Sequence, residues 1–165
     1  MPATGFFCMI EGIEGDSKID GFENQIELLH FELNIKQPLS NSTGTGSLTA
    51  PAEQYQEFRM SKSIDKASPK LMLYAIEGKH IKKVDVSLCR TAQDKPVAYL
   101  KYEFGDVVLS FYHQVADLNG DNLPDEKFGF TYQQIKITYT GSGLISGRSQ
   151  APFSVQHNLR TGRSE

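Results

Sequence analysis

The sequence predicts a mainly β domain, a small antiparallel β-barrel or two-sheet sandwich with one short α-helix at about residues 68–77. Two observations lead to this fold class. Apolar and polar residues alternate along much of the chain, which is the period of strands with one buried face. One segment near the middle has helical spacing instead, with a start signal and a stop signal at its ends.

The alternation predicts six strands. In residues 81–88 the apolar Val84, Val86 and Leu88 fall on one face, and in residues 128–132 aromatic residues occupy the alternate positions. The expected strands are 6–13, 25–35, 54–62, 81–90, 97–114 with a break at 105–106, and 127–139. Residues 151–159 would add an edge strand.

The predicted helix is punctuated at both ends. Ser68 is the expected N-cap, Pro69 suits the first turn and Gly78 suits a left-handed stop. Apolar residues share one side at helical spacing, so the helix should lie on a sheet. That side consists of Leu71, Met72 and Ala75.

Composition predicts one domain spanning residues 1–165. The chain of 165 residues is 39% hydrophobic and 22% charged, which suits a sizeable core. A net charge of −3 gives no reason to expect a nucleic-acid partner. No apolar run has the length of a membrane span, and the first residues lack the features of a signal peptide, so we expect no membrane insertion and synthesis in the cytoplasm.

Two segments are expected to be loosely ordered, a loop at about 39–50 and a tail at about 141–165. The loop is rich in Gly, Ser and Thr and cannot pack a core, yet it is long for a connection without a function. It does not match a dinucleotide fingerprint, because Thr49 replaces the third glycine and no helix follows.

The chain has no recognisable catalytic constellation. Its four histidines are scattered, and no Gly-x-Ser-x-Gly elbow is present. Cys8 and Cys89 are too few and too far apart for a disulfide scaffold or a zinc cluster, and we expect two buried, inert thiols. An enzyme is therefore not expected.

The acidic turn at 117–125 spaces oxygen-bearing side chains in a way that could supply several ligands to a hard cation such as calcium. These side chains, at i, i+2, i+4 and i+8, are Asp117, Asn119, Asp121 and Asp125. Asn122 stands where calcium loops usually have glycine, and Phe128 occupies the place of the bidentate glutamate of an EF-hand. The alternative is a polar turn between two strands. No other cofactor is expected.

Several motifs in the same order resemble one known family. They are Asp-Lys-Ala-Ser-Pro at 65–69 with Gly-Lys-His at 78–80, the strand and Gly-x-Ser turn at 6–17 with 25–29, the strand at 99–110, and Pro-Asp-Glu at 124–126 before a strand ending at 139. From about residue 5 to residue 140 the chain resembles the Hcp (haemolysin-coregulated protein) family, the tube subunits of type VI secretion systems. It departs from many members by Phe31 in place of tryptophan and by a longer acidic loop.

The resemblance implies a structural tube subunit. Members of this family form hexameric rings that stack into a hollow tube, which a contractile sheath drives out of a bacterium. The implied partners are further copies of the chain, a spike protein at the tube tip, sheath proteins and effector proteins carried in the lumen. The implied localisation is the bacterial cytoplasm, followed by export to the exterior or into target cells without a signal peptide.

The resemblance also suggests two groups of contact residues. In the second expected strand, Leu29, Phe31 and Leu33 share one face, taken as core, while Leu28 and three polar residues alternate onto the other. The polar residues, candidate contacts for cargo in the lumen, are His30, Glu32 and Asn34. Ordinary outward polarity of an exposed strand is the alternative. The candidate ring-stacking contacts lie in the 39–50 loop and are Ser40, Asn41, Thr43, Gly44 and Gly46.

Two other function classes stay open at this point. One is a calcium-binding β-sandwich interaction module built around the acidic turn. The other is an enzyme joined to a tube module, but the tail from residue 140 to residue 165 is too short to bury a catalytic core.

Overall fold

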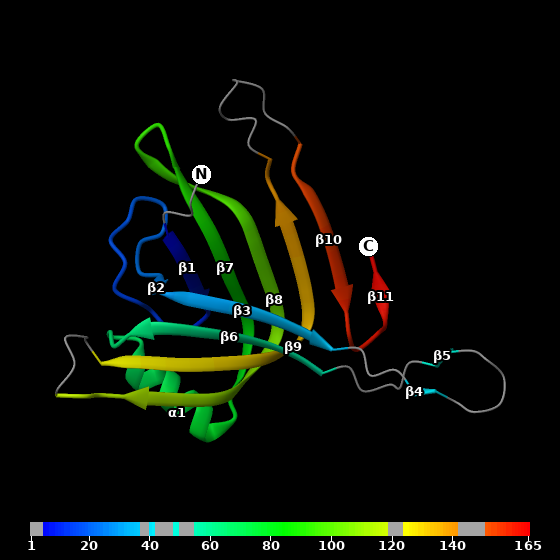
Figure 1. Ribbon diagram of the computed structural model, residues 1–165, viewed down its shortest axis with the longest axis horizontal. Helices are drawn as coiled ribbons and strands as arrows, with labels where there is room; N and C mark the ends of the chain where they lie inside the picture. Colours follow the sequence, from blue (N-terminus) through cyan, green and yellow to red (C-terminus); the bar gives the residue numbers. More distant parts are fainter. Residues whose placement is uncertain (1–4, 37–39, 42–47, 50–54, 119–123, 142–150) are drawn as a thin grey trace.

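The mainly β prediction is confirmed by the computed structural model, which describes residues 5–36, 40–41, 48–49, 55–118, 124–141 and 151–165 (Figure 1). Within these residues there is one helix, and all strand pairs are antiparallel. In chain order the elements are β1 (Gly5–Ile10), β2 (Ile26–Leu28), β3 (His30–Lys36), β4 (Ser40–Asn41), β5 (Leu48–Thr49), β6 (Tyr55–Ser63), α1 (Ser68–Glu77), β7 (His80–Ala92), β8 (Lys95–Val115), β9 (Asp125–Tyr139), β10 (Phe153–Asn158) and β11 (Arg163–Ser164).

The long hairpin of β8 and β9 connects the two parts of the sheet. Nine strands form one sheet with the order β11-β10-β9-β8-β7-β1-β2, and β6 joins it through β9 and carries β3 on its other side. β9 pairs with β10 through residues 134–139 and with β6 through residues 125–130. The sheet thus folds back into two layers, visible above and below the bend of β8 and β9 in Figure 1, but it does not close into a barrel.

The bend is a corner that crosses three strands at one level. On each of β7, β8 and β9, two buried residues are separated by two residues that are not buried, so the alternation of the strand changes phase. These buried pairs are Ile81 and Val84, Phe104 and Val107, and Tyr132 and Ile135. Their register matches across the strands, because Ile81 faces Val107, which faces Tyr132, and Val84 faces Phe104, which faces Ile135.

The corner replaces the break that the sequence suggested at Gly105–Asp106. Strand β8 continues through it, with Asp106 in left-handed geometry at φ 54°. At Gly105 a Cβ atom would lie 2.9 Å from the side-chain oxygen of Gln134 on the neighbouring strand. At the corner the backbone of β8 at Gly105 therefore packs closely against the Gln134 side chain of β9.

One hydrophobic core lies inside the fold and spans both sides of the corner. The ring of Phe104 lies 4.9 Å from those of Phe58 and Phe130, measured between centroids. Cys8 and Cys89 are fully buried and unbridged, as predicted. Burial raises the pKa of both thiols, that of Cys89 to about 11, which keeps them protonated.

The helix has the predicted bounds, but two of its residues behave differently from the prediction. Ser68 is not the N-cap. It is the first helical residue, and Ala67 precedes it without a side-chain cap. Met72 is 46% exposed, and Tyr74 takes the inner side instead, because positions 71, 74 and 75 follow the i, i+3, i+4 spacing of one helix face. Gly78 ends the helix in left-handed geometry as expected, with φ 60°.

The second expected strand is divided at Leu29. Leu28 ends β2, which pairs with β1, whereas β3 pairs with β6. At the bend between them the Leu29 N–H donates to the Ser61 carbonyl, and the Leu29 side chain is 60% exposed while Leu28 is buried. The prediction that Leu29 shares the core face with Phe31 and Leu33 is therefore wrong, because the chain changes partner strand there.

The described parts of the 39–50 loop form a ladder of their own. Ser40 pairs with Thr49 and Asn41 with Leu48, and this two-stranded sheet is separate from the large one (Figure 1). Thr43, Gly44 and Gly46 lie outside the described residues. In the tail, β10 confirms the expected strand, but it is not the edge of the sheet, because β11, which was not expected, pairs with it there.

Candidate assembly surfaces

A buried polar cluster lies beneath the start of α1, and we call it the buried tie: Lys62, Asp65, Ser68, Tyr112 and Glu126. The Lys62 ammonium forms an ion pair with Glu126 and another, at 2.6 Å, with Asp65, and Lys62 and Glu126 are both fully buried. Ser68 Oγ donates to Glu126 Oε1 at 2.9 Å, and the Tyr112 hydroxyl donates to Glu126 Oε2 at 2.5 Å. Burial, and then the hydrogen bond to Glu126, raises the pKa of Tyr112. The motif at 65–69 thus fixes α1 to β6, β8 and β9.

The candidate cargo residues lie on the edge strand β3. His30 and Glu32 are exposed, and Asn34 is half-buried. Glu32 lies opposite Arg59 on β6, and their side-chain charges are 4.0 Å apart. Arg59 also contacts Glu57, a residue of β6 whose side chain is only 4% exposed, at 2.8 Å. Nothing in this geometry distinguishes a cargo contact from an ordinary exposed strand, and the cargo role stays a prediction.

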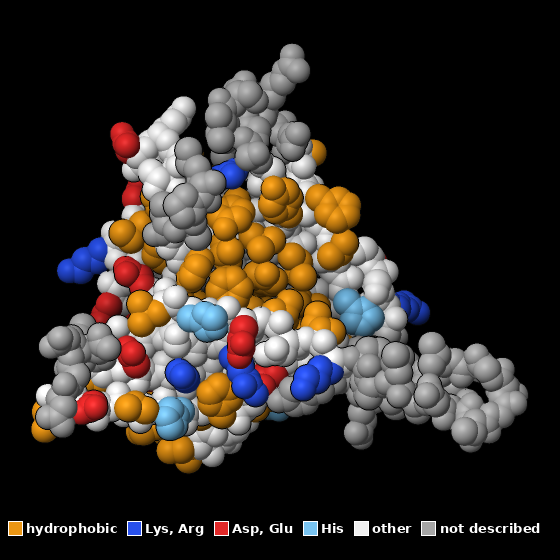
Figure 2. Space-filling model, in the orientation of Figure 1, with side chains coloured by type: hydrophobic (Ala, Val, Ile, Leu, Met, Phe, Trp, Pro, Cys, Tyr) orange, Lys and Arg blue, Asp and Glu red, His pale blue; other side chains and the backbone are white. Residues whose placement is uncertain are grey.

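Among the described residues, exposed apolar side chains gather in two places that bear on assembly. The first is on the outer side of α1, where Met72, Leu73 and Ile76 are 46%, 45% and 74% exposed. The second lies on the inner face of β8, β9 and β10, beside β3, where Figure 2 shows hydrophobic side chains in the centre of the view. We call this second surface the apolar mouth. Its exposed members are Tyr139, Phe153 and Val155, and its half-buried members are Tyr102 and Ile137.

The register explains why these residues share the mouth. Tyr139 lies opposite Phe153, and Ile137 lies opposite both Val155 on β10 and Tyr102 on β8. Directly paired residues of an antiparallel sheet point to the same side. They therefore extend the core-facing side of the sheet toward β3. Among the described strands β3 pairs only with β6, so β3 is an edge strand.

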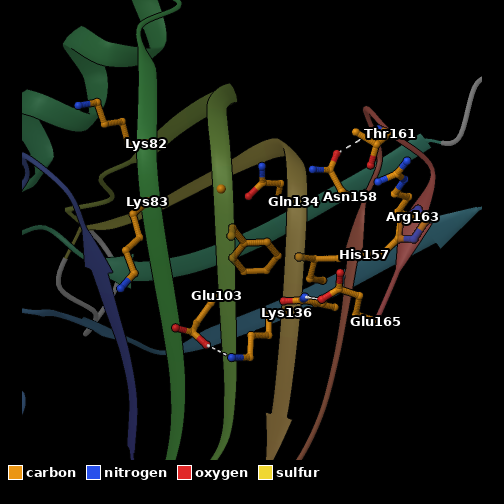
Figure 3. A pocket seen from close by; sticks show the side chains of 14 residues that line it. Lys82, Lys83, Glu103, Gln134, Lys136, His157, Asn158, Thr161, Arg163 and Glu165 are labelled. Carbon is orange, nitrogen blue, oxygen red and sulfur yellow. Dashed lines mark hydrogen bonds and ion pairs between the residues drawn. The ribbon is translucent and has the colours of Figure 1, made fainter.

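The outer face of the same strands is polar and hollowed. A depression of about 550 Å³ lies at the corner, and residues of β7 to β11 line it (Figure 3). We call it the outer trough. Its charged lining residues are Lys82, Lys83, Glu103, Lys136, Arg163 and Glu165.

Ion pairs link several outer-face charges into a ladder across three strands, which we call the outer ladder. The carboxylate of Asp85 lies 3.3 Å from the Lys83 ammonium and 3.4 Å from that of Lys101. Glu103 lies 3.6 Å from Lys101 and 4.0 Å from Lys136. By contrast, no ion pair reaches Lys82 or Arg163 within the part of the chain that the structure describes.

The predicted calcium ligands are only partly visible. Asp117 and Asp125 are exposed on either side of the β8–β9 turn, and Asn119 and Asp121 lie outside the described residues. Among the residues that are described, no three His, Cys, Asp or Glu side chains gather as a metal site would require. The calcium site stays a prediction.

Sequence reasoning missed the outer trough, because its residues come from five strands that are distant along the chain. The alternation marked them only as outward-facing polar residues.

In the described part of the chain, no helix is long and apolar enough to cross a bilayer.

Comparison with known proteins points in one direction. A family model described as "Type VI secretion system effector, Hcp" matches residues 7–139. Protein hcp1 of Pseudomonas aeruginosa is 23% identical over 158 residues, which cover 96% of each chain. A solved type six secretion system protein superposes with a TM-score of 0.83 at 23% identity, covering 98% of this chain and 99% of its own. Hcp1 from Salmonella typhimurium superposes with a TM-score of 0.76 at 24% identity, covering 99% of this chain and all of its own.

Proposed function

We propose, from the premise that this chain belongs to the Hcp family of type VI secretion proteins, that it is a structural subunit of the secretion tube. Hcp is a family of secreted tube proteins and not an enzyme family. In this proposal six copies form a ring, rings stack into a hollow tube, and the tube carries effectors out of the cell with a spike protein at its tip and a sheath around it.

The observation that carries this proposal is the apolar mouth. Tyr139, Phe153 and Val155 are 50%, 70% and 48% exposed and lie together on one sheet face. Contiguous exposed apolar surface on a soluble chain marks a contact with another molecule. The edge of β3 that pairs with no other described strand lies beside it and offers backbone hydrogen-bonding groups to the same neighbour. A neighbouring subunit would cover both.

The β4–β5 ladder supports a contact between rings. In Figure 1 it lies beyond the end of β3, and it pairs with no strand of the large sheet. A short two-stranded ladder is marginal by itself in water and gains stability by packing on something else. We therefore assign residues 39–50 to stacking and keep His30, Glu32 and Asn34 as the cargo contacts.

Light scattering after size exclusion, followed by electron microscopy, tests ring formation. We expect a mass six times that of the chain and ring-shaped particles. Replacing Phe153 and Val155 by Ser should shift the population to monomers, whereas Glu77→Gln, an exposed change at the end of α1, should not. A monomer at every concentration would contradict the proposal.

A second variant tests stacking separately. Replacing residues 40–49 by a tight Asn-Gly turn should preserve the folded chain and the ring but abolish tubes, because six weak contacts per ring junction would be lost together. Continuous tubes of the shortened variant would place the stacking contacts elsewhere.

A further inference from the structure

We propose that the outer trough docks the acidic β1–β2 segment of a second copy of this chain. The acidic segment is defined as residues 11–27. The inference rests on the proposed function, since it names the surfaces through which neighbouring subunits of one ring recognise each other.

The acidic segment carries an excess of negative charge. Its charged residues are Glu11, Glu14, Asp16, Lys18, Asp20, Glu23 and Glu27, all exposed. Glu14 pairs with Lys66 at 3.3 Å and Asp20 with Lys95 at 3.1 Å. Within the described residues no ion pair reaches Glu11, Glu23 or Glu27. These three carboxylates are therefore available to a partner.

The acidic segment is also held in one shape, so its charges form a fixed pattern. Phe22 stacks on Phe7 of β1 with ring centroids 4.5 Å apart. The Gly15 N–H donates to the Asn24 carbonyl at 2.8 Å, and the Asn24 N–H donates to the Ser17 carbonyl at 2.8 Å. A preordered surface loses little conformational entropy when it docks.

The outer trough offers the complementary surface. Lys82 and Arg163 lie on opposite sides of it, on β7 and β11, as Figure 3 shows, and both lack an ion-pair partner among the described residues. The acids of the trough are engaged, since Glu103 pairs with lysines and Glu165 accepts a hydrogen bond from the Gln156 side-chain amide at 2.5 Å. Carboxylates that enter between the two free cations would complete their pairing.

The position of the two surfaces suits a ring. The acidic segment joins the terminal strand β2, and the outer trough extends to β11, the strand at the other end of the sheet order. Within one chain the β7 side of the trough borders the acidic segment, since the Glu11 N–H donates to the Lys83 carbonyl, and the Arg163 side lies at the far end of the sheet order. Two different, complementary surfaces on one chain give a head-to-tail contact, which repeats from copy to copy and closes into a ring when the rotation permits.

Charge reversal in two matched variants tests this contact. One carries Glu23→Lys and Glu27→Lys, and the other carries Lys82→Glu and Arg163→Glu. Each alone should weaken oligomerisation at least about tenfold, because like charges then face each other at every contact. An equimolar mixture should restore rings, since the two variants can alternate around an even-numbered ring. Glu77→Lys with Lys127→Glu, which reverses exposed charges away from both surfaces, is the control.

Circular dichroism and light scattering in low and high salt provide the measurements. Folded single variants that lose the ring, with recovery on mixing and a salt-sensitive ring in the unmodified chain, support the contact. Unmodified chains that form rings while both variants oligomerise equally well would overturn this contact and leave the proposed function standing. No recovery on mixing would also overturn it. Absence of rings in the unmodified chain would overturn the proposed function itself.

Discussion

The buried tie and the outer ladder are both networks of alternating charges across strands, but they differ in their contact with water. Lys62 and Glu126 in the buried tie are fully buried. In the outer ladder Lys83, Lys101 and Lys136 are 40% to 49% exposed, and only the Asp85 side chain, at 11%, is nearly buried. A buried charge that loses its partner keeps its desolvation cost, while an exposed charge is solvated again. The first network therefore fixes the fold, and the second leaves the surface free to recognise a partner.

Removing one buried charge should give the largest effect. Glu126→Leu leaves the Lys62 ammonium without its buried partner, and the free energy of unfolding should fall by about 3–5 kcal/mol. Urea unfolding measures it. Lys62→Met combined with Glu126→Leu should cost less than the sum of the two single changes, because both charges are then absent. A loss below about 1 kcal/mol for Glu126→Leu would show that the tie does not hold α1.

Removing a hydroxyl from the same network should have a smaller effect. Tyr112→Phe deletes the hydrogen bond to Glu126 Oε2 and should lower the free energy of unfolding by about 1.5–3 kcal/mol, the range for hydrogen bonds to charged groups. Tyr99→Phe, which changes a hydroxyl outside the network, is the control. Equal losses in the two variants would mean that the hydrogen bond from the Tyr112 hydroxyl to Glu126 stabilises the fold no more than a hydroxyl outside the network does.

Alkaline pH distinguishes buried neutral groups from exposed charges. The pKa of Cys89 is raised by burial from 9.0 to about 11, so its contribution to stability is complete below pH 9.0 and declines as the pH rises toward 11. The thiol ionises first in the unfolded chain, which should lower the free energy of unfolding by about 1 kcal/mol near pH 10. Cys89→Ala should flatten this decline in urea titrations. An unchanged slope would assign the decline to other groups.

The smallest effect is expected in the outer ladder. Glu103→Gln removes ion pairs with Lys101 and Lys136, and the free energy of unfolding should change by about 0–1 kcal/mol. Repeating the urea titration in high salt should make the variant and the unmodified chain converge. A loss as large as that of Glu126→Leu would remove the distinction between the two networks.

The sequence predicted the parts of the fold that depend on local pattern. The helix bounds and the strands around β7 and β9 follow from spacing and turn residues within each segment. Leu29 and Met72 were misplaced because their exposure depends on the strand or helix face that packs against them, which no local pattern records. Ser68 was misassigned for a related reason, since its hydroxyl bonds to Glu126, 58 residues away.

The candidate site was less predictable than the fold. His30, Glu32 and Asn34 were found on β3, where alternation placed them, but the outer trough required the order of five strands. Lys82 and Arg163 are far apart along the chain, and no local pattern links them. Only the pairing of strands brings β7 and β11 into one sheet, so that the two cations line opposite sides of one depression.

The corner of the sheet also has a mechanical meaning. A hinge concentrates rotation in a few loop residues or element ends, but here β7, β8 and β9 continue through the angle as strands. They keep the same register on both sides of the corner, where each ladder omits only the position of Asp106. Opening or closing that angle would have to shear two ladders and the aromatic rings that pack inside the bend. The two layers are therefore held at a fixed angle, and a force applied to one layer is transmitted to the other instead of bending the corner.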